Sequence, residues 1–411
     1  MPRAFRGPHT SSTALDIGVY GARGVPSTYS GYETFLTLLL PELAKRGDRV
    51  TMYCRSGEDF TNDDWQGVHR KVLPTIPGKN FSTLSHGLVA GVAARFARHD
   101  VVLVVNVANA AYCALSRYTR QPVVLNVDGQ EWLRGKWGNS AKTIFLRSAQ
   151  ISRHCASALI ADGAAMADIY RDEFASDTTV IPYCVTNGDW TKNPATVQNL
   201  GLEPYRYLLI AGRHNPENNI DRIVRDYAAG SHPLPLVVLG TANYDSPVTT
   251  AIAELAERDE RIRMLGHVGD RNAFFDLVHH AKVYLHGHSV GGTNPSLVEA
   301  MGTGSRIAAF DTAFSREVLG DNAEYFNLDE TAGPNAGLNS LDRAVTTILD
   351  DNPTHDLHVR DQTAARAGDL YNVDDVVGAY RDLLAAAANS RRPVSLRTRW
   401  AAGTRANAAS R

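Results

Sequence analysis

The chain has 411 residues, of which 44% are hydrophobic and 21% are charged, and its formal net charge is −2. This composition is typical of a globular protein with large cores, and the near balance of charge gives no general attraction to nucleic acid. The four cysteines form no CxxC pair, and no apolar run has the length of a membrane span or a signal peptide. We therefore expect a cytoplasmic protein without disulfides.

Apolar runs of strand length alternate with helix-like segments along most of the chain. Strands are predicted at 16–20, 49–54, 101–106, 122–127, 158–162 and 179–183, and then at 207–212, 234–240, 262–266, 283–287 and 306–311. Several of these runs are apolar throughout, as in parallel strands that are covered on both faces. The pattern predicts an α/β protein with parallel sheets.

A polar segment at 186–203, which contains Pro and Gly, divides the strands into two series. It predicts two doubly wound, Rossmann-like domains, at 14–188 and 203–370, followed by an amphipathic helix at 371–388. Ligands of such sheets bind at the carboxyl ends of the strands, so two facing domains predict a cleft between them. Residues 389–411 are expected to form a basic, disordered tail, because 391–411 contain six arginines and no acid. Contact of this tail with an anionic membrane is the alternative.

The most specific motif is HSVGGTNPSLVEAMGTG at 288–304. Gly291 and Gly292 allow close approach of the backbone, Asn294 is a good helix N-cap, and Pro295 suits the first helical position. A helix start of this kind binds anions through its free N–H groups. The groups expected to face outward are those of Gly292, Thr293, Ser296 and Leu297. The alternative is an ordinary strand-to-helix turn.

Two further strand ends carry polar residues. Arg213 follows Gly212 at the start of the second series, where a guanidinium can bind phosphate. The alternative is a surface arginine paired with Glu217. The segment NVDGQEWLRGKW at 126–137 suits stacking on a sugar, unless its tryptophans are core residues beside a solvated charged face. Within ten residues it contains Asp128, Glu131, Trp132, Arg134, Lys136 and Trp137.

The loop after the first strand does not have the GxGxxG spacing of a dinucleotide-binding fold, because its glycines at 18, 21 and 24 are three apart. The second strand ends at Cys54 and Arg55, with no acid to hold a ribose, which disfavours a nicotinamide-dependent dehydrogenase. Gly31 just precedes the first helix, so this loop can still present N–H groups to an anion. The histidines lack HxxxH and HExxH spacing, and we predict no metal site.

Four stretches together resemble a known family: YGARGVPSTYSGYETF, NVDGQEWLRGKW, GRHNPENNI and HSVGGTNPSLVEAM. They are similar to the retaining family 4 glycosyltransferases of GT-B fold, and within these to the bacterial rhamnosyltransferase-like group of cell-surface polysaccharide synthesis. The resemblance covers roughly residues 14–388. It implies two Rossmann-like domains facing across a cleft, with the helix at 371–388 crossing back to the first domain. A plain C-terminal helix of the second domain is the alternative.

The resemblance also implies roles for individual residues. The glycine turn and helix start, with Gly292, Thr293 and Asn294, would hold the diphosphate and sugar of a nucleotide-sugar donor. Glu299 would hold the ribose hydroxyls, and Arg213 and Gly31 would flank the diphosphate. Three positions depart from the family pattern. Gly291 stands where many members have a glutamate, Asn218 where many have a lysine, and Asp128 where many have a histidine.

We therefore expect a metal-independent glycosyltransferase that uses no cofactor and acts on a glycan or polyprenyl-linked glycan acceptor, at the inner face of the cell membrane. Asp128 is expected to orient the reacting sugar, and Asn218 to contact the donor. The acceptor side is expected to include Arg23, Glu131, Trp132 and Arg134. The alternatives are a nucleotide-sugar 2-epimerase of the same fold and a non-catalytic subunit that binds nucleotide-sugar.

Overall fold

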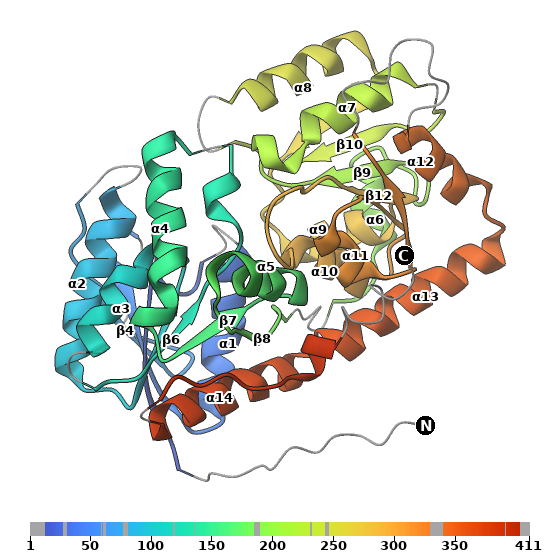
Figure 1. The fold of residues 1–411 in the computed structure, drawn as a ribbon. Helices are drawn as coiled ribbons and strands as arrows, with labels where there is room; N and C mark the ends of the chain where they lie inside the picture. Colours follow the sequence, from blue (N-terminus) through green and yellow to red (C-terminus); the bar gives the residue numbers. More distant parts are fainter. Residues whose placement is uncertain are drawn as a thin grey trace.

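A computed structural model describes residues 13–27, 31–58, 60, 63–76, 81–117, 120–135, 137–184, 190–230, 232–242, 246–328, 340–390 and 392–402. Its two α/β domains lie next to each other, each built on one twisted sheet (Figure 1). The expected fold of two doubly wound parallel-sheet domains is confirmed.

The N-terminal sheet has eight strands, all parallel to their neighbours except β3, which pairs antiparallel with β4. In spatial order they are β3 (Asp64–Trp65), β4 (Val68–Leu73), β2 (Arg49–Arg55), β1 (Asp16–Tyr20), β5 (Val101–Val105), β6 (Val123–Asn126), β7 (Ala158–Ala161) and β8 (Thr179–Val180). The chain reverses its direction of winding between β1 and β5, and doubly wound sheets bind ligands at such a point.

The C-terminal sheet has six parallel strands and the same winding, with the reversal between β9 and β12. Its spatial order is β11 (Ile262–Gly266), β10 (Leu236–Leu239), β9 (Leu208–Ala211), β12 (Val283–His286), β13 (Ile307–Phe310) and β14 (Ala323–Phe326). Each of the eleven strands predicted from the sequence coincides with an observed strand. The strands not predicted are β3, β4 and β14; β4 was missed because its exposed and buried residues are mixed and include Arg70.

Helices cover both faces of each sheet, and the apolar cores lie between the layers. On the N-terminal sheet, one face is covered by α1 (Gly31–Lys45) and α14 (Val373–Asn389), and the other by α2 (Phe81–Ala97), α3 (Ala110–Arg117), α4 (Asn139–Cys155) and α5 (Ala164–Phe174). On the C-terminal sheet, α7 (Ile220–Ala229), α8 (Pro247–Arg258) and α12 (Ser340–Asp350) lie opposite α6 (Pro194–Gln198), α9 (Arg271–His279), α10 (Pro295–Gly302), α11 (Ala313–Leu319) and α13 (Pro353–Leu370).

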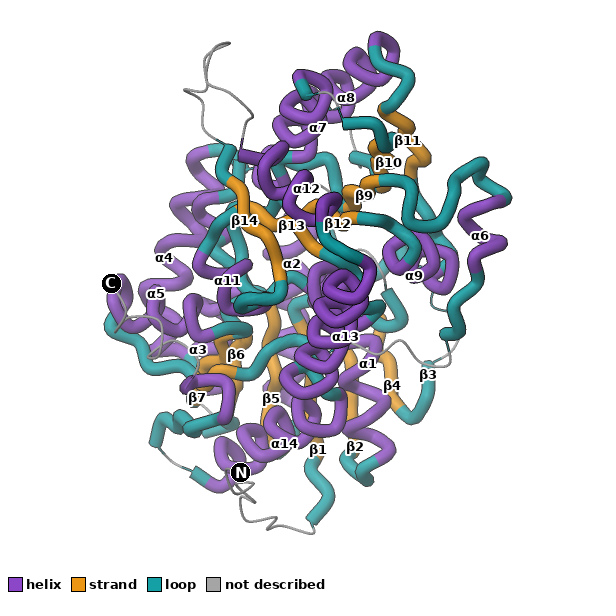
Figure 2. The backbone as a smooth tube through the Cα atoms, turned by 90° about the vertical axis from the view of Figure 1, so that its right-hand side faces the viewer, coloured by secondary structure: helices purple, strands orange, loops and turns teal. Residues whose placement is uncertain are grey.

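The end of the chain returns to the N-terminal domain. Helix α13 packs on α10 of the C-terminal domain, and α14 then packs on α1, β5 and β6 (Figure 2). Two polar contacts fix α14 there: the Asn126 side chain donates to the Tyr380 hydroxyl at 2.8 Å, and Arg381 pairs with the buried Asp48 at 2.9 Å. The two domains are therefore connected twice, by the segment before β9 and by the turn between α13 and α14.

The residues from 392 to 402 correct the expectation of a disordered tail from 389. The backbone N–H of Leu396 donates to Thr179 at 2.9 Å, and the Trp400 indole N–H donates to the carbonyl of Leu370 at 2.6 Å. Val394, Leu396 and Trp400 also pack against the core shared by α1 and α14. These residues pack on the protein because three apolar side chains lie among the arginines. The expectation of a disordered tail missed this because it considered only the charge of the segment. Residues 403–411 lie outside the described part of the chain.

The two domains come into close contact at three glycine residues. A Cβ atom built on Gly31 would lie 2.8 Å from the ring of Pro295, and one built on Gly129 would lie 2.9 Å from Cα of Gly291. At Gly292 the same atom would lie 1.8 Å from the Asp162 carboxylate. The Thr293 hydroxyl completes this contact by donating to the carbonyl of Asp162 at 2.5 Å. Glycine at these positions lets the carboxyl edges of both sheets border one space.

Removing residues 391–411 should lower the melting temperature by several degrees, because it deletes the contacts of Leu396 and Trp400, each worth about 1 kcal/mol. The matched control is a chain that ends at Ala402 and keeps these contacts. Differential scanning calorimetry of both forms checks the prediction, and equal melting temperatures for the two truncations would contradict it.

Gly292→Ala should force the domains apart or displace Asp162, with a loss of about 1–3 kcal/mol as in other overpacked cores. The control is Gly269→Ala, where an added Cβ would meet only His267, at 4.0 Å. Adding Asp162→Ala to Gly292→Ala should restore stability by vacating the space. The measurements are the melting temperature and the radius of gyration in solution; an unchanged Gly292→Ala protein would be inconsistent with the tight contact.

Candidate functional site

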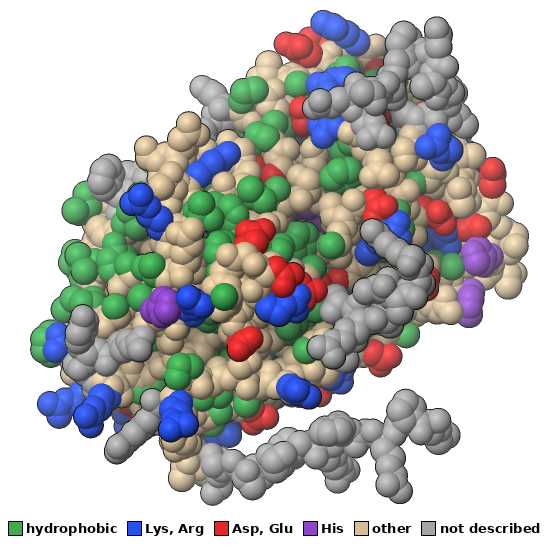
Figure 3. All heavy atoms as spheres, viewed as in Figure 1, with side chains coloured by type: hydrophobic (Ala, Val, Ile, Leu, Met, Phe, Trp, Pro, Cys, Tyr) green, Lys and Arg blue, Asp and Glu red, His purple; other side chains and the backbone are tan. Residues whose placement is uncertain are grey.

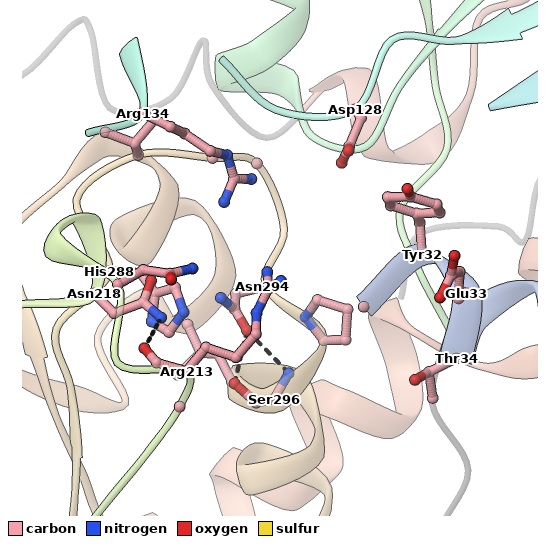
Figure 4. A pocket seen from close by; sticks show the side chains of 18 of the residues that line it. Tyr32, Glu33, Thr34, Asp128, Arg134, Arg213, Asn218, His288, Asn294 and Ser296 are labelled. Atoms are coloured by element: carbon pink, nitrogen blue, oxygen red, sulfur yellow. Dashed lines mark hydrogen bonds between the residues drawn. The ribbon is translucent and has the colours of Figure 1, made fainter. Parts of the chain in front are cut away.

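A cavity of about 1140 Å³ lies between the domains, where the carboxyl ends of β1, β2, β5 and β6 face those of β9 and β12. Both domains contribute to its lining, as predicted for a cleft between two doubly wound sheets. Figure 4 shows Arg213, Asn218, His288 and Asn294 of the C-terminal domain opposite Asp128 and Tyr32 of the N-terminal domain. Of the expected site residues, all except Trp132 line this cavity.

The start of α10 forms part of the C-terminal wall. Asn294 is its N-cap, and the Asn294 side-chain oxygen accepts from the backbone N–H of Ser296 at 3.0 Å. The N–H of Leu297 is also used, because it donates to the Asn294 carbonyl at 3.0 Å. The expectation that Ser296 and Leu297 present free N–H groups is therefore wrong, since the cap satisfies them. Gly292 and Thr293 remain the residues that bring this turn to the cavity.

Arg213 follows β9 and extends toward the start of α10 (Figure 4). It forms no ion pair with a carboxylate in the described parts of the chain, and Glu217 instead lies 3.6 Å from Arg134. The alternative of an Arg213–Glu217 pair is thus wrong. The Asn218 side chain donates to the Arg213 carbonyl at 2.7 Å, so Asn218 fixes the loop that carries the arginine.

Glu299 lies on α10 with its carboxylate near the cavity wall. Arg271 donates to it at 2.7 Å, and both residues line the cavity. Burial raises the pKa of Glu299, and the charge of Arg271 acts in the opposite direction. A ligand hydroxyl can reach this carboxylate only by sharing or displacing Arg271.

Two stacked histidines at the end of β12 were not predicted as site residues. The rings of His286 and His288 have centroids 4.5 Å apart, and the Nδ1 atom of each is buried without a described hydrogen-bond partner. Burial lowers the pKa of His286 to about 3, and burial together with His286, Arg134 and Arg213 holds the pKa of His288 well below its usual value. Both imidazoles are neutral at physiological pH and line the cavity. They were not marked in the sequence, because their spacing matches neither HxxxH nor HExxH.

Asp128 stands on the N-terminal wall directly after β6, with a left-handed backbone (φ 56°). The Tyr183 hydroxyl donates to its carboxylate at 3.1 Å. Burial and the nearby Glu131 raise the pKa of Asp128, whereas Arg134 and the Tyr183 hydrogen bond lower it. The Asp128 carboxylate faces the cavity beside Tyr32 (Figure 4).

Glu131 and Arg134 line the cavity but also pair with each other. The indole N–H of Trp137 donates to Glu131 at 2.7 Å, and Arg134 approaches Glu217 of the opposite domain. Trp132 corrects the prediction of an acceptor-side residue, because it packs against Tyr170 and Phe174 in the core. Trp132 lies in the short helix η2 (Glu131–Leu133). In this helix the Trp132 side chain is directed into the core, and that of the following residue, Leu133, is exposed to solvent. Trp137 lines the cavity instead, while Lys136 lies outside the described residues.

The remaining N-terminal wall surrounds the start of α1. Glu33 accepts from the Arg23 N–H at 3.0 Å and from the Ser27 hydroxyl at 2.8 Å, and the Arg23 guanidinium pairs with Glu58 at 3.0 Å. Arg55 at the end of β2 was not predicted as a site residue. Its Nε is buried without a described hydrogen-bond partner, and its guanidinium donates to the Thr83 hydroxyl at 3.3 Å. Burial lowers the pKa of Arg55, and the nearby Tyr32, Glu33 and Glu58 act in the opposite direction. Arg55 forms no ion pair with a carboxylate of the described residues.

The described residues hold no group of three or more His, Cys, Asp or Glu side chains placed to bind a metal ion. Among the helices of the described residues, none combines the length and apolar character that a membrane crossing needs.

Several solved structures have a similar fold. Anabaena HepE in complex with UDP has a TM-score of 0.69 and 16% identity, and the match covers 90% of this chain and 100% of that one. The sucrose-phosphate synthase of Thermosynechococcus elongatus has a TM-score of 0.73 and 17% identity, covering 90% and 99%. An Escherichia coli trehalose-6-phosphate protein bound with UDP-2-fluoro glucose has a TM-score of 0.68 and 10% identity, covering 90% and 98%. At these identities the likeness establishes the fold.

No curated protein sequence matches the chain. The model of Glycosyltransferase Family 4 matches residues 29–186, which make up most of the N-terminal domain. The chain thus combines a domain matching glycosyltransferase family 4 with the two-domain GT-B architecture.

Proposed function

We propose that this protein is a glycosyltransferase that moves a sugar from a nucleoside diphosphate to a hydroxyl of a glycan or polyprenyl-linked glycan. The observation that carries the proposal is the lining of one cavity. Arg213, the glycine turn before α10 and Glu299 lie on one wall, and Asp128 lies on the other. This arrangement supports a site in which one donor molecule would meet Arg213 with its diphosphate, Glu299 with its ribose hydroxyls and Asp128 with its sugar.

The donor would lie along the C-terminal wall. Arg213 and the turn at Gly292 would meet the diphosphate, since a guanidinium and a helix start both favour negative charge. Glu299 would accept hydrogen bonds from the ribose hydroxyls, with Arg271 moving aside or binding a phosphate. The neutral imidazole of His288 would supply a hydrogen-bonding group to the donor between Arg213 and Arg134.

The reaction would proceed with retention and without a metal ion. Arg213 would stabilise the charge that develops on the departing diphosphate, which is the role that a cation plays in such reactions. A departing phosphate oxygen would take the proton of the acceptor hydroxyl on the same face of the sugar. Asp128, held by Tyr183, would orient the reacting sugar, and we assign no side-chain nucleophile.

The acceptor would enter along the N-terminal wall. Arg55 forms no direct ion pair with a described carboxylate, so its guanidinium could bind an acceptor with a phosphate group, such as a polyprenyl diphosphate-linked glycan. Such an acceptor agrees with a role in cell-surface polysaccharide synthesis at the inner face of the membrane. Rhamnose is our proposal for the sugar, on the strength of the sequence motifs at 126–137 and 288–301.

The test is a donor screen followed by product analysis. Thermal shifts with UDP-, GDP-, ADP- and dTDP-sugars identify the base, and incubation with the best donor, with and without a glycan acceptor, identifies the reaction. A new glycosidic bond of retained configuration supports the proposal. An epimerised nucleotide-sugar without acceptor would identify an epimerase, and donor binding without any turnover would identify a binding subunit.

Arg213→Ala should weaken binding of the nucleoside diphosphate by about 10- to 100-fold, because a charge-assisted hydrogen bond is worth about 1.5–3 kcal/mol. Binding of the free nucleoside should change little. Isothermal titration calorimetry with UDP and uridine, or the corresponding pair of the preferred base, measures both. The control is Arg258→Ala, an exposed arginine of α8. An equal loss for nucleotide and nucleoside would show that Arg213 does not meet the phosphates.

Asp128→Asn should leave the donor dissociation constant nearly unchanged and lower turnover by about 100-fold, because a misplaced sugar loses the geometry of reaction. Asn has the same size and can still accept from Tyr183, so the fold should persist. The matched control is Asp172→Asn on α5, which is exposed. Lost donor binding with normal turnover at saturating donor would move Asp128 to the nucleotide site.

A further inference from the structure

Large hydrophobic side chains are exposed mainly on one part of the N-terminal domain. Eight of the eleven that are exposed in the described residues lie between 72 and 151. Helix α2 exposes Leu88, Val92 and Phe96, which are four residues apart and therefore form a row along one side of the helix, and Phe96 is 74% exposed. Helix α4 exposes Ile144 and Ile151, two turns apart. Such side chains are usually scattered singly, so a continuous row indicates an interaction surface.

These residues belong to one layer of the fold. Helices α2, α3 and α4 cover the same face of the N-terminal sheet, and α3 packs against both of its neighbours. Their outer sides form one surface, which we call the α2–α4 face and define by Leu88, Val92, Phe96, Ile144 and Ile151. Figure 3 shows hydrophobic side chains gathered over these helices, with Lys and Arg side chains along the edge.

The charge of the α2–α4 face differs from that of the whole protein. The chain contains 42 basic and 44 acidic residues, but no Asp or Glu occurs in 65–99 or in 132–161, which include all of α2 and α4. Helix α3 also lacks acidic residues. Arg95, Arg98 and Arg147 are exposed on this part of the domain. The face is therefore locally positive on a protein close to neutrality.

We propose that the α2–α4 face binds the surface of an anionic lipid bilayer. A row of apolar side chains flanked by arginines has the chemistry of an interfacial helix, in which apolar groups enter the headgroup region and cations lie beside lipid phosphates. A protein partner of this face would have to be both apolar and acidic, whereas a bilayer with anionic lipids offers both properties everywhere.

The position of α2 connects this surface with the cavity. Ser82 and Thr83 in the first turn of α2 line the cavity, and the exposed row begins less than two turns later, at Leu88. Binding of the face to a bilayer would hold the N-terminal wall of the cavity next to the lipid surface. Lipid binding by the α2–α4 face follows from the exposure and charge of its side chains. A test of lipid binding therefore does not depend on the proposed transfer reaction.

The experiment is flotation of the full chain with phosphatidylglycerol–phosphatidylcholine vesicles and with phosphatidylcholine vesicles, in low and high salt. The wild-type protein should float with the anionic vesicles, less so at high salt because salt screens the arginines. Leu88→Gln/Val92→Gln/Phe96→Gln should reduce the partition coefficient by about tenfold or more. Arg95→Gln/Arg147→Gln should reduce it and also weaken its dependence on salt.

The matched control is Leu357→Gln, which removes a side chain that is 62% exposed on α13 of the other domain. It should float like the wild type. Unchanged melting temperatures and donor binding establish that all variants are folded. The proposal is overturned if the wild type does not float, or if Leu357→Gln lowers flotation as much as the α2 variant. It is also overturned if the α2 variant floats normally but loses self-association in sedimentation without vesicles, since the face would then bind a second copy of the chain.

Discussion

The close approach of two sheet edges is the constraint on which the site depends. At Gly31, Gly129 and Gly292, an added methyl group would meet the opposite domain at 2.8, 2.9 and 1.8 Å. Without side chains at these positions, Arg213 and Glu299 of one domain can line the same cavity as Asp128 of the other. Polar contacts hold this arrangement: Thr293 donates to Asp162, and Glu317 of α11 accepts from the first N–H groups of α5, including that of Ala165 at 2.8 Å.

Several charges around the cavity are already paired within the protein. Glu131 pairs with Arg134, Glu58 with Arg23, and Glu299 with Arg271. Arg213 and Arg55 have no such partner among the described residues, one on each wall of the cavity. Burial meanwhile raises the pKa values of Asp128, Asp162 and Glu299, and clustering of such perturbed groups in a cleft is typical of functional sites. The proposed donor and acceptor anions would meet these two unpaired cations.

The path of the chain ties the site to the rest of the molecule. Helix α14 and residues 392–402 bind the N-terminal domain, while α13 remains on the C-terminal domain, so any change in the distance between the walls must act on the turn between these helices. The opposite face of the same N-terminal sheet carries the α2–α4 face. One sheet thus supports the domain crossing on one side and the proposed lipid-binding surface on the other.

The sequence by itself determined the two parallel sheets, because their central strands are apolar runs that only a doubly covered sheet can bury. It also determined the start of α10, since Asn294 and Pro295 favour that helix locally. Tertiary structure decided the rest. Trp132 is a core residue and Trp137 a cavity residue, although both are tryptophans of one short loop. Asp162, Arg55 and His288 belong to the site only because the carboxyl edges of the two sheets face each other across the cavity. In the sequence, Leu88, Val92 and Phe96 look like the buried apolar stripe of any helix. Only the structure shows that this side of α2 is uncovered, because exposure depends on how the helices pack.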